Sequence, residues 1–223
     1  MNVSRPEGAE ASYDAVADEY TRRIFHELDD KPLDREWLDR FAARMRGKGV
    51  VADIGCGPGH VTRYLHERGV QVCGVDLSSA MIECARELNP GIEFLHADMR
   101  ALRVPDGSWA GIVAFYSLIH IARDLITQTL REFRRLLRPG GWLLLSFHCG
   151  DETLHLDEWW GHQVSLDFLF FHPDEMTGYL AAAGFTVEEV TLREPYAPDV
   201  EHQSRRCYML ARRRSEATPI GAA

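Results

Sequence analysis

Apolar residues recur with two different spacings along this chain, and the change between them predicts where helices and strands lie. Near the N-terminus, Tyr13, Val16, Ala17 and Tyr20 recur at intervals of three and four residues. This spacing places all four on one face and predicts an amphipathic helix that begins at residue 12. The same reasoning predicts a second helix over residues 34–45, ended by the glycines that follow it.

From residue 50 onward, short apolar runs alternate with helical patterns. Strands are predicted at residues 50–54, 71–75, 92–96, 111–116 and 142–147. Helices are predicted between them at residues 60–68, 78–88 and 125–137. Strands that alternate with helices of this length form a doubly wound, mostly parallel sheet. The chain is therefore expected to have an α/β fold.

The C-terminal part breaks this rhythm. A helix is predicted at residues 173–183, followed by strands at 186–193 and 206–211 with only a loop between them. A loop of that length suits an antiparallel pair better than a parallel crossover, so a seven-stranded sheet with an antiparallel hairpin at its C-terminal edge is expected. Residues 149–172 are predicted to be an irregular segment. Long connections in compact domains are often functional, so this segment is a candidate lid over a substrate.

Composition and charge narrow the classes of protein that fit. The 223 residues suit one main domain, because domains commonly have about 100–200 residues. Lys and Arg number 25 against 34 Asp and Glu, which gives a net charge of 25 − 34 = −9. This balance argues against a general nucleic-acid binder, whose affinity depends on basic residues.

The sequence shows neither a membrane span nor a secretion signal. No run approaches the roughly 18 apolar residues that indicate a transmembrane helix, and the N-terminus lacks an apolar signal core. The five cysteines form no C-x-x-C pair, which indicates reduced thiols rather than a disulfide framework or a zinc ribbon. A cytoplasmic protein without membrane contact is expected.

The stretch VVADIGCGPGH, residues 50–60, carries the clearest chemical signal. Gly55, Gly57 and Gly59 allow a tight turn and a close approach of a ligand, and the next helix presents its N-terminus to an anionic group. The dinucleotide pattern G-x-G-x-x-G does not fit, because the third glycine comes one position early and His60 takes its place. The Gly-Lys-Ser/Thr ending of a P-loop is also absent.

Acidic residues follow the next two predicted strands. Asp76 ends the second strand, where a carboxylate can accept hydrogen bonds from both hydroxyls of a ribose. The alternative is that Asp76 caps the following helix, although Ser78 can take that role. Asp98 and Met99 follow the third strand and suit an adenine amino group and ring face, with a solvated turn as the alternative. Ligands of open parallel sheets bind at these strand ends.

With these motifs together, the sequence resembles the class I S-adenosylmethionine-dependent methyltransferases, which have a Rossmann-like fold. It is similar to the branch that contains ubiquinone and menaquinone biosynthesis enzymes and many small-molecule methyltransferases. The matching segments lie within about residues 50–148 and are VVADIGCGPGH, VCGVDLSSAMIECAR, FLHADMRALRVPDGSWAGIV, FYSLIHI and the run ending in LLRPGGWLLLSF. The resemblance implies S-adenosylmethionine as cofactor and S-adenosylhomocysteine as its product.

The resemblance also implies which residues surround the cofactor. They are Gly55, Cys56, Gly57, Phe115 and Tyr116 at the methionine end, Asp76, Leu77 and Met81 along the ribose and nucleoside, and Asp98 and Met99 at the adenine. Tyr13 and Tyr20 are candidates as well if the N-terminal helix closes over the cofactor, with simple hydrophobic packing as the alternative. The implied organisation is a helical cap over residues 1–48, a methyltransferase domain over 49–214 with a lid at about 149–172, and a disordered tail at 215–223.

An acceptor hydroxyl or protonated amine must lose a proton, and histidine is the side chain best suited to take it near neutral pH. His120, just past the fourth strand, is the first candidate, with a structural polar contact as the alternative, and His148 is the second. A metal site built from His148, His155, His162 or His172 lacks short ligand spacing, so no metal is expected.

The predicted function is transfer of a methyl group to an oxygen, nitrogen or carbon atom of a small metabolite. Aromatic residues in the candidate lid favour an apolar or aromatic acceptor. The expected partner is a small molecule, without nucleic acid or membrane, for a monomer or homodimer. Two alternatives stay open: a non-catalytic S-adenosylmethionine-binding regulator, and a methyltransferase that acts on a macromolecule.

Overall fold

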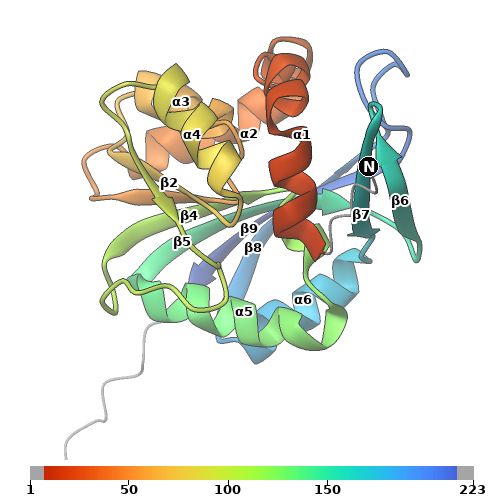
Figure 1. Cartoon of the computed structure of the whole chain (residues 1–223). Coiled ribbons are helices and arrows are strands. Elements are labelled where there is room, and N and C mark those ends of the chain that lie inside the picture. Colours follow the sequence, from red (N-terminus) through yellow and green to blue (C-terminus); the bar gives the residue numbers. More distant parts are fainter. Residues whose placement is uncertain (1–7, 215–223) are drawn as a thin grey trace, which may run out of the picture.

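The computed structural model describes residues 8–214, which form one mixed sheet with helices on both faces and a separate small hairpin (Figure 1). The helices are α1 Gly8–Ile24, η1 Glu27–Asp30, α2 Pro32–Met45, α3 His60–Glu67, α4 Ser79–Leu88, η2 Leu118–His120, α5 Arg123–Leu136 and α6 Pro173–Ala182. The strands are β1 Val51–Ile54, β2 Val72–Asp76, β3 Glu93–His96, β4 Trp109–Phe115, β5 Leu137–His148, β6 Thr153–Trp159, β7 His162–Leu169, β8 Phe185–Arg193 and β9 Arg206–Arg213.

The seven-stranded sheet has the order β3-β2-β1-β4-β5-β9-β8. The first five strands pair in parallel, whereas β9 is inserted between β5 and β8 and is antiparallel to both. The predicted α/β fold, with a mostly parallel sheet and an antiparallel C-terminal hairpin, is confirmed. Because β1 and β4 lie next to each other while their connections leave in opposite directions, the sheet has a switch point at their carboxyl ends.

Apolar strand residues alternate between two core layers. Ile112 and Leu145 point to the layer beneath the sheet in Figure 1, where α5 and α6 supply Phe133 and Met176. Val113 points to the opposite layer, which α2 and α3 fill. Residues buried on both faces explain why the strands β1, β4 and β5 read as continuous apolar runs in the sequence.

The expectation of an irregular segment at residues 149–172 is wrong. Strands β6 and β7 form an antiparallel hairpin with a turn at Trp160 and Gly161, both of which have positive φ. Two positive φ values match the twist of a two-residue hairpin turn. The missed signal was the alternation that places Val164, Leu166 and Phe168 on one face, which packs against α1.

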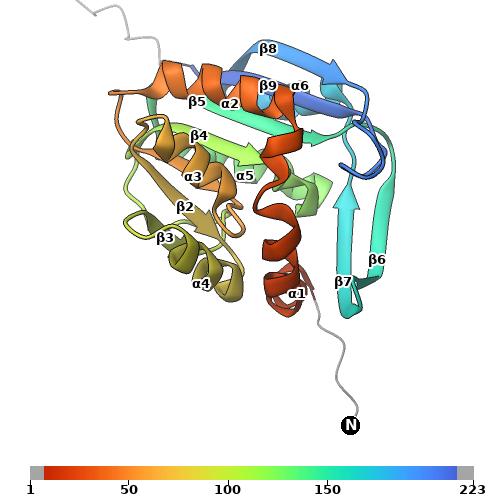
Figure 2. The ribbon, with the colours of Figure 1, turned by 90° about the horizontal axis from the view of Figure 1, so that it is seen from above.

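Helix α1 begins at Gly8, four residues earlier than predicted, and α2 begins at Pro32, two residues earlier. Seen from above (Figure 2), α1 lies between α4 and β7 and contacts both. This helix therefore covers the carboxyl ends of the parallel strands. The disordered tail predicted at residues 215–223 lies outside the described residues.

No helix within residues 8–214 combines the length and the apolar character that crossing a bilayer requires.

Candidate active site

The glycine loop between β1 and α3 lies directly against the strand ends. The amides of Gly55 and Cys56 both donate to the carbonyl of Val75, at 2.7 and 3.1 Å, so the loop continues the pairing of β1 with β2. Gly55 has φ +74°, and a Cβ at this position would lie 2.2 Å from Cβ of Ser117. Only glycine allows this approach between the loop and the segment after β4.

Asp76, the last residue of β2, connects the glycine loop to the start of α4. Its Oδ2 accepts from the amide of Gly57 at 2.8 Å and its Oδ1 from the amide of Ser78 at 2.9 Å. Burial raises the pKa of the Asp76 carboxyl, while the backbone donors oppose that rise. Ser78 Oγ accepts from the amide of Met81 at 3.1 Å, so Ser78 is the residue that caps α4. The alternative that Asp76 is simply the cap is therefore not supported.

A cavity of about 310 Å³ opens between these strand ends and α1. It is lined by all the predicted cofactor-binding residues except Cys56. Those residues are Tyr13, Tyr20, Gly55, Gly57, Asp76, Leu77, Met81, Asp98, Met99, Phe115 and Tyr116. His120 also lines this cavity. The structure thus brings together residues that are up to about half the chain apart in sequence.

Cys56 lies in the same loop, but its side chain points away from the cavity. It is 2% exposed and packs with Ile82, Ala85 and Phe94. Burial raises the pKa of its thiol. Any contact of this residue with a ligand in the cavity is therefore limited to its backbone.

His120 is held between two hydrogen-bond partners. Its Nδ1 lies 2.9 Å from the backbone carbonyl of Asp167 in β7, and its Nε2 lies 2.8 Å from the hydroxyl of Tyr13 in α1. Burial lowers the pKa of the imidazole to about 4, because the neutral carbonyl compensates little of the lost hydration. His120 is therefore neutral at physiological pH.

His148, the second predicted base, is not among the residues that line the cavity. Its Nδ1 lies 2.8 Å from Ser204 Oγ, and its ring stacks on Phe170 with centroids 4.9 Å apart. Burial, together with the charge of Arg206, lowers its pKa well below the usual value. His148 instead packs against Tyr116, whose ring centroid is 5.4 Å from that of the imidazole.

An aromatic wall stands on the hairpin side of the cavity: Tyr13 and Tyr20 line the cavity, whereas Trp159 and Phe168 pack against lining residues from outside it. Tyr13 and Tyr20 of α1 meet edge to face at 5.7 Å, and Trp159 lies 5.9 and 5.6 Å from them. Phe168 continues the wall from Trp159 to His120. These contacts explain why the hairpin and α1 pack together around the cavity.

Sequence reasoning missed two cavity residues that pair with each other, Glu27 and His60. Glu27 Oε1 lies 3.0 Å from His60 Nε2, and its other oxygen pairs with Lys31. Burial by itself would raise the pKa of Glu27, but Lys31 and His60 outweigh it and lower that pKa to about 2. His60 had a weak signal because it directly follows Gly59, whereas nothing in the sequence marked Glu27.

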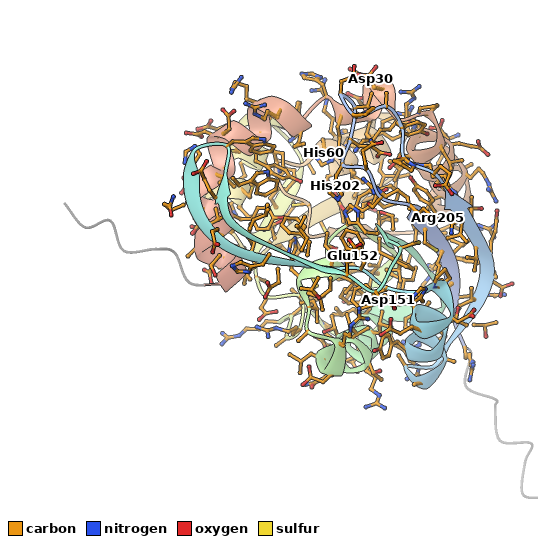
Figure 3. The ribbon with its side chains drawn as sticks, turned by 90° about the vertical axis from the view of Figure 1, so that its right-hand side faces the viewer. Asp30, His60, Asp151, Glu152, His202 and Arg205 are labelled. Carbon is orange, nitrogen blue, oxygen red and sulfur yellow. The ribbon has the colours of Figure 1, made fainter. Side chains whose placement is uncertain are left out.

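Figure 3 shows the side of the molecule on which the hairpin lies. Asp30 of η1 is at the top, Asp151 and Glu152 of the loop before β6 are below, and His60 and His202 lie between them. Four segments that are distant in sequence therefore contribute to this face.

A buried network of charges supports the cavity behind Tyr116. Tyr116 itself has φ +51°, and its hydroxyl lies 3.2 Å from that of Tyr208. Tyr208 donates to Asp34 Oδ2 at 2.7 Å, and Arg193 Nη2 lies 3.2 Å from the same oxygen. Arg193 also pairs with Glu201. This network ties α2 to the C-terminal strands and fixes the phenol ring of Tyr116.

Asp98 is at the edge of the cavity and is already partnered. Arg100 contacts its carboxylate at 2.6 Å and thereby lowers the pKa of Asp98.

Asp53 lies beneath the glycine loop and accepts from Thr62 Oγ1 at 2.6 Å. Burial raises the pKa of Asp53 to about 6. No group of three or more His, Cys, Asp or Glu side chains in the described part of the chain is placed to hold a metal ion.

Comparisons with known proteins agree with this geometry. Residues 51–141 match the family model described as a methyltransferase domain. A malonyl-[acyl-carrier protein] O-methyltransferase of Enterobacter lignolyticus (strain SCF1) is 28% identical over 152 residues, which are 66% of this chain and 58% of that protein. The chain therefore spans less than two thirds of that relative's length.

A ubiquinone biosynthesis O-methyltransferase of Pseudomonas aeruginosa (strain UCBPP-PA14) is similar over a longer stretch, with 28% identity over 210 residues, 86% of this chain and 88% of that protein. Among solved structures, DhpI in complex with SAH superposes with a TM-score of 0.71 at 24% identity and covers 92% of this chain and 94% of that chain. A methyltransferase of Methanosarcina mazei gives a TM-score of 0.69 at 18% identity, covering 79% of this chain and 98% of that chain. These superpositions establish the same fold.

Proposed function

Because this chain belongs to the class I S-adenosylmethionine-dependent methyltransferases, we propose that it transfers a methyl group from that cofactor to a small metabolite. The acceptor atom is an oxygen, nitrogen or carbon of an apolar or aromatic molecule. The observation that carries this proposal is the position of Asp76 and the glycine loop beside His120 in one cavity.

The residues present fit the cofactor, which carries a sulfonium and an ammonium group. Glu27 and Asp76 line the cavity with carboxyl groups, and the ring of Tyr20 also lines it. Carboxylates and aromatic faces both attract cationic groups such as the sulfonium and the ammonium. Ser117 Oγ is buried, and within the described residues it has no hydrogen-bond partner. It lines the cavity beside Gly55 and offers a polar contact to a ligand at the methionine end.

The proposed binding roles follow from the lining of the cavity. Gly55 and Gly57, with Phe115 and Tyr116, hold the methionine end, and Asp76 accepts the ribose hydroxyls. Leu77, Met81, Asp98 and Met99 surround the nucleoside, and Tyr13 and Tyr20 cover it from α1. When bound, the cofactor supplies an electrophilic methyl group on a positively charged sulfur.

Side chains of this protein exclude water, position the acceptor and take up its proton. Tyr13 and Tyr20, which line the cavity, exclude water and hold the acceptor in place, since a productive geometry needs reacting atoms about 3–3.5 Å apart. His120, neutral and fixed between Asp167 and Tyr13, is the base that gains a proton when the acceptor loses one. Both curated relatives described above are named as O-methyltransferases, which favours an oxygen acceptor.

Calorimetric titration with S-adenosylmethionine tests the proposal. The wild-type chain is expected to bind, and Asp76→Ala is expected to weaken binding at least about tenfold, because charge-assisted bonds to the ribose contribute roughly 1.5–3 kcal/mol each. Asp199→Ala, which changes an exposed carboxylate between β8 and β9, is the matched control and should bind as the wild type does. Absence of binding by the wild-type chain would reject the proposed function, and equal affinity of Asp76→Ala would reject the role of Asp76.

A further inference from the structure

We infer that Tyr13 is a catalytic residue that takes the proton of a neutral acceptor hydroxyl and passes its own proton to His120. The acceptor site is accordingly built for a hydroxyl that donates a hydrogen bond, and not for a carboxylate. This inference rests on the proposed function, because it concerns the acceptor of the same methyl transfer.

The direction of two hydrogen bonds carries the argument. A backbone carbonyl can only accept, so the Nδ1 of His120 that faces Asp167 O at 2.9 Å must carry a hydrogen. In the neutral imidazole, Nε2 is then left as an acceptor. The hydroxyl of Tyr13, 2.8 Å from Nε2, must therefore donate to it. The carbonyl oxygen of Asp167 thus fixes the tautomer of His120, because that oxygen cannot donate a hydrogen bond.

The direction of the hydrogen bond from Tyr13 to His120 determines which atoms of the Tyr13 hydroxyl face the cavity. With its hydrogen directed at His120, the Tyr13 oxygen offers only lone pairs to a ligand. A hydroxyl can donate to those lone pairs, whereas a carboxylate would face them without a hydrogen between and would be repelled. Asp76, whose charge acts on Tyr13, adds to the unfavourable field for an anion. Burial and that charge raise the pKa of Tyr13, so its hydroxyl remains protonated before the reaction.

The surroundings hold both side chains in this arrangement. Tyr13 is confined by Tyr20 and Trp159, and the His120 ring meets Phe168 at 4.8 Å. Helix α1 is fixed on its other side because Asp14 Oδ1 accepts from Ser78 Oγ at 2.6 Å. A proton path that is preorganised in this way needs no rearrangement during the reaction.

The transfer step balances in atoms and charge. The acceptor oxygen forms a bond to the methyl carbon while the carbon–sulfur bond breaks and its electron pair goes to sulfur. The acceptor's proton moves to the oxygen of Tyr13, and the Tyr13 proton moves to Nε2 of His120. The positive charge of the sulfonium thus ends on the imidazolium, which releases its proton to solvent after the product leaves.

Benzene derivatives that differ only in the reacting group test the inference. Phenol, catechol and 2-naphthol are offered beside benzoate and 2-naphthoate, and formation of S-adenosylhomocysteine is measured. At least one hydroxyl compound is expected to be methylated and neither carboxylate. Methylation of a carboxylate would overturn the inference, and so would a chain that binds S-adenosylmethionine but methylates none of the hydroxyl compounds.

The Tyr13→Phe variant should lower the turnover number of the hydroxyl compound at least about 100-fold, since a positioned proton acceptor contributes about 10²–10⁴-fold. Its affinity for S-adenosylmethionine should stay within about threefold of the wild type. A loss of cofactor affinity that accounts for the whole loss of turnover would instead make Tyr13 a binding residue only.

A spectroscopic measurement does not depend on activity. In protein with ¹⁵N-labelled histidine, the His120 resonances should show hydrogen on Nδ1 and an accepting Nε2 that shifts in Tyr13→Phe. Tyr179→Phe removes a hydroxyl from α6, which does not line the cavity, and should leave these resonances unchanged. Hydrogen on Nε2 would overturn the inference even if the proposed function holds, whereas a wild-type chain that does not bind S-adenosylmethionine would reject the function and leave this result standing.

Discussion

The hydroxyl of Ser12 forms two hydrogen bonds with the backbone of Ser165: it accepts from the Ser165 amide at 3.0 Å and lies 3.3 Å from the Ser165 carbonyl, to which it donates. Ser12 is fully buried in α1, and Ser165 is in β7. The side chain of a helix thus takes the place that a neighbouring strand would have on the edge of the hairpin. This contact holds α1, with Tyr13 next in sequence, over the cavity.

Replacement of Ser12 by Ala should therefore destabilise the protein by about 1–3 kcal/mol, because the partly buried amide of Ser165 loses its acceptor. Urea unfolding measures this loss. Ser108→Ala, which removes an exposed hydroxyl bonded to Pro105 O, is the control and should change the free energy of unfolding much less. Equal stability of the two variants would show that the contact between α1 and β7 does not depend on this hydroxyl.

Gly55→Ala should be more harmful than substitution of another glycine with positive φ. Gly91 has φ +91° with open space around it, so Gly91→Ala reports the backbone strain alone, about 1–2 kcal/mol. Gly55→Ala adds a collision with Ser117 and should unfold at a clearly lower urea concentration. The double variant Gly55→Ala/Ser117→Gly should recover part of the loss, since it removes the colliding Cβ. No recovery would mean that the close approach to Ser117 is not what excludes a side chain at position 55.

Arg193→Met should cost about 3–5 kcal/mol in the free energy of unfolding, because the buried carboxylate of Asp34 loses its ion-pair partner, whereas Glu201 keeps Arg206 at 3.5 Å. The control is Arg63→Met, which breaks an ion pair with Glu67 whose side chains are both about half exposed. That change should cost about 1 kcal/mol or less. The network behind Tyr116 would be a minor contributor if chemical denaturation gave similar values for both variants.

The stability of the protein should fall on acidification in part through His120. Its pKa is about 4 in the folded state and about 6.5 in the unfolded chain. Between these values the unfolded chain binds a proton that the folded chain does not, so the contribution of His120 is complete above pH 6.5 and is lost as the pH falls towards 4. Asp53, with a pKa near 6, titrates with the opposite sign over part of this range, so a comparison of variants is needed.

Unfolding experiments at pH 7, 5.5 and 4.5 make that comparison. His120→Gln has no group that titrates at this position and should lose less stability between pH 7 and 4.5 than the wild type does. His66→Gln, a change at an exposed position of α3, should follow the wild-type slope. If His120→Gln also follows the wild-type slope, the neutral imidazole between Tyr13 and Asp167 does not set the acid stability.

The order of elements could be predicted because each depends on residues close together in the chain. Continuous apolar runs marked β1, β4 and β5, and the helical spacing of the N-terminal residues marked α1, although its start at Gly8 was missed. The hairpin β6–β7 escaped prediction, since its polar face carries histidines and acids and its turn places Trp160 in an unusual conformation.

The sequence by itself determined the parallel sheet, the glycine loop and the acidic strand ends that follow it, because strand ends of one sheet must meet at one edge. Only the tertiary structure decided the contact of Tyr13 with His120, the pairing of Glu27 with His60, and the positions of His148 and the Cys56 thiol outside the cavity. These relationships join residues that are 33 to 107 positions apart or depend on how a side chain packs. Neither periodicity nor motif spacing records such contacts, because they are set by which surfaces the folded chain buries against each other.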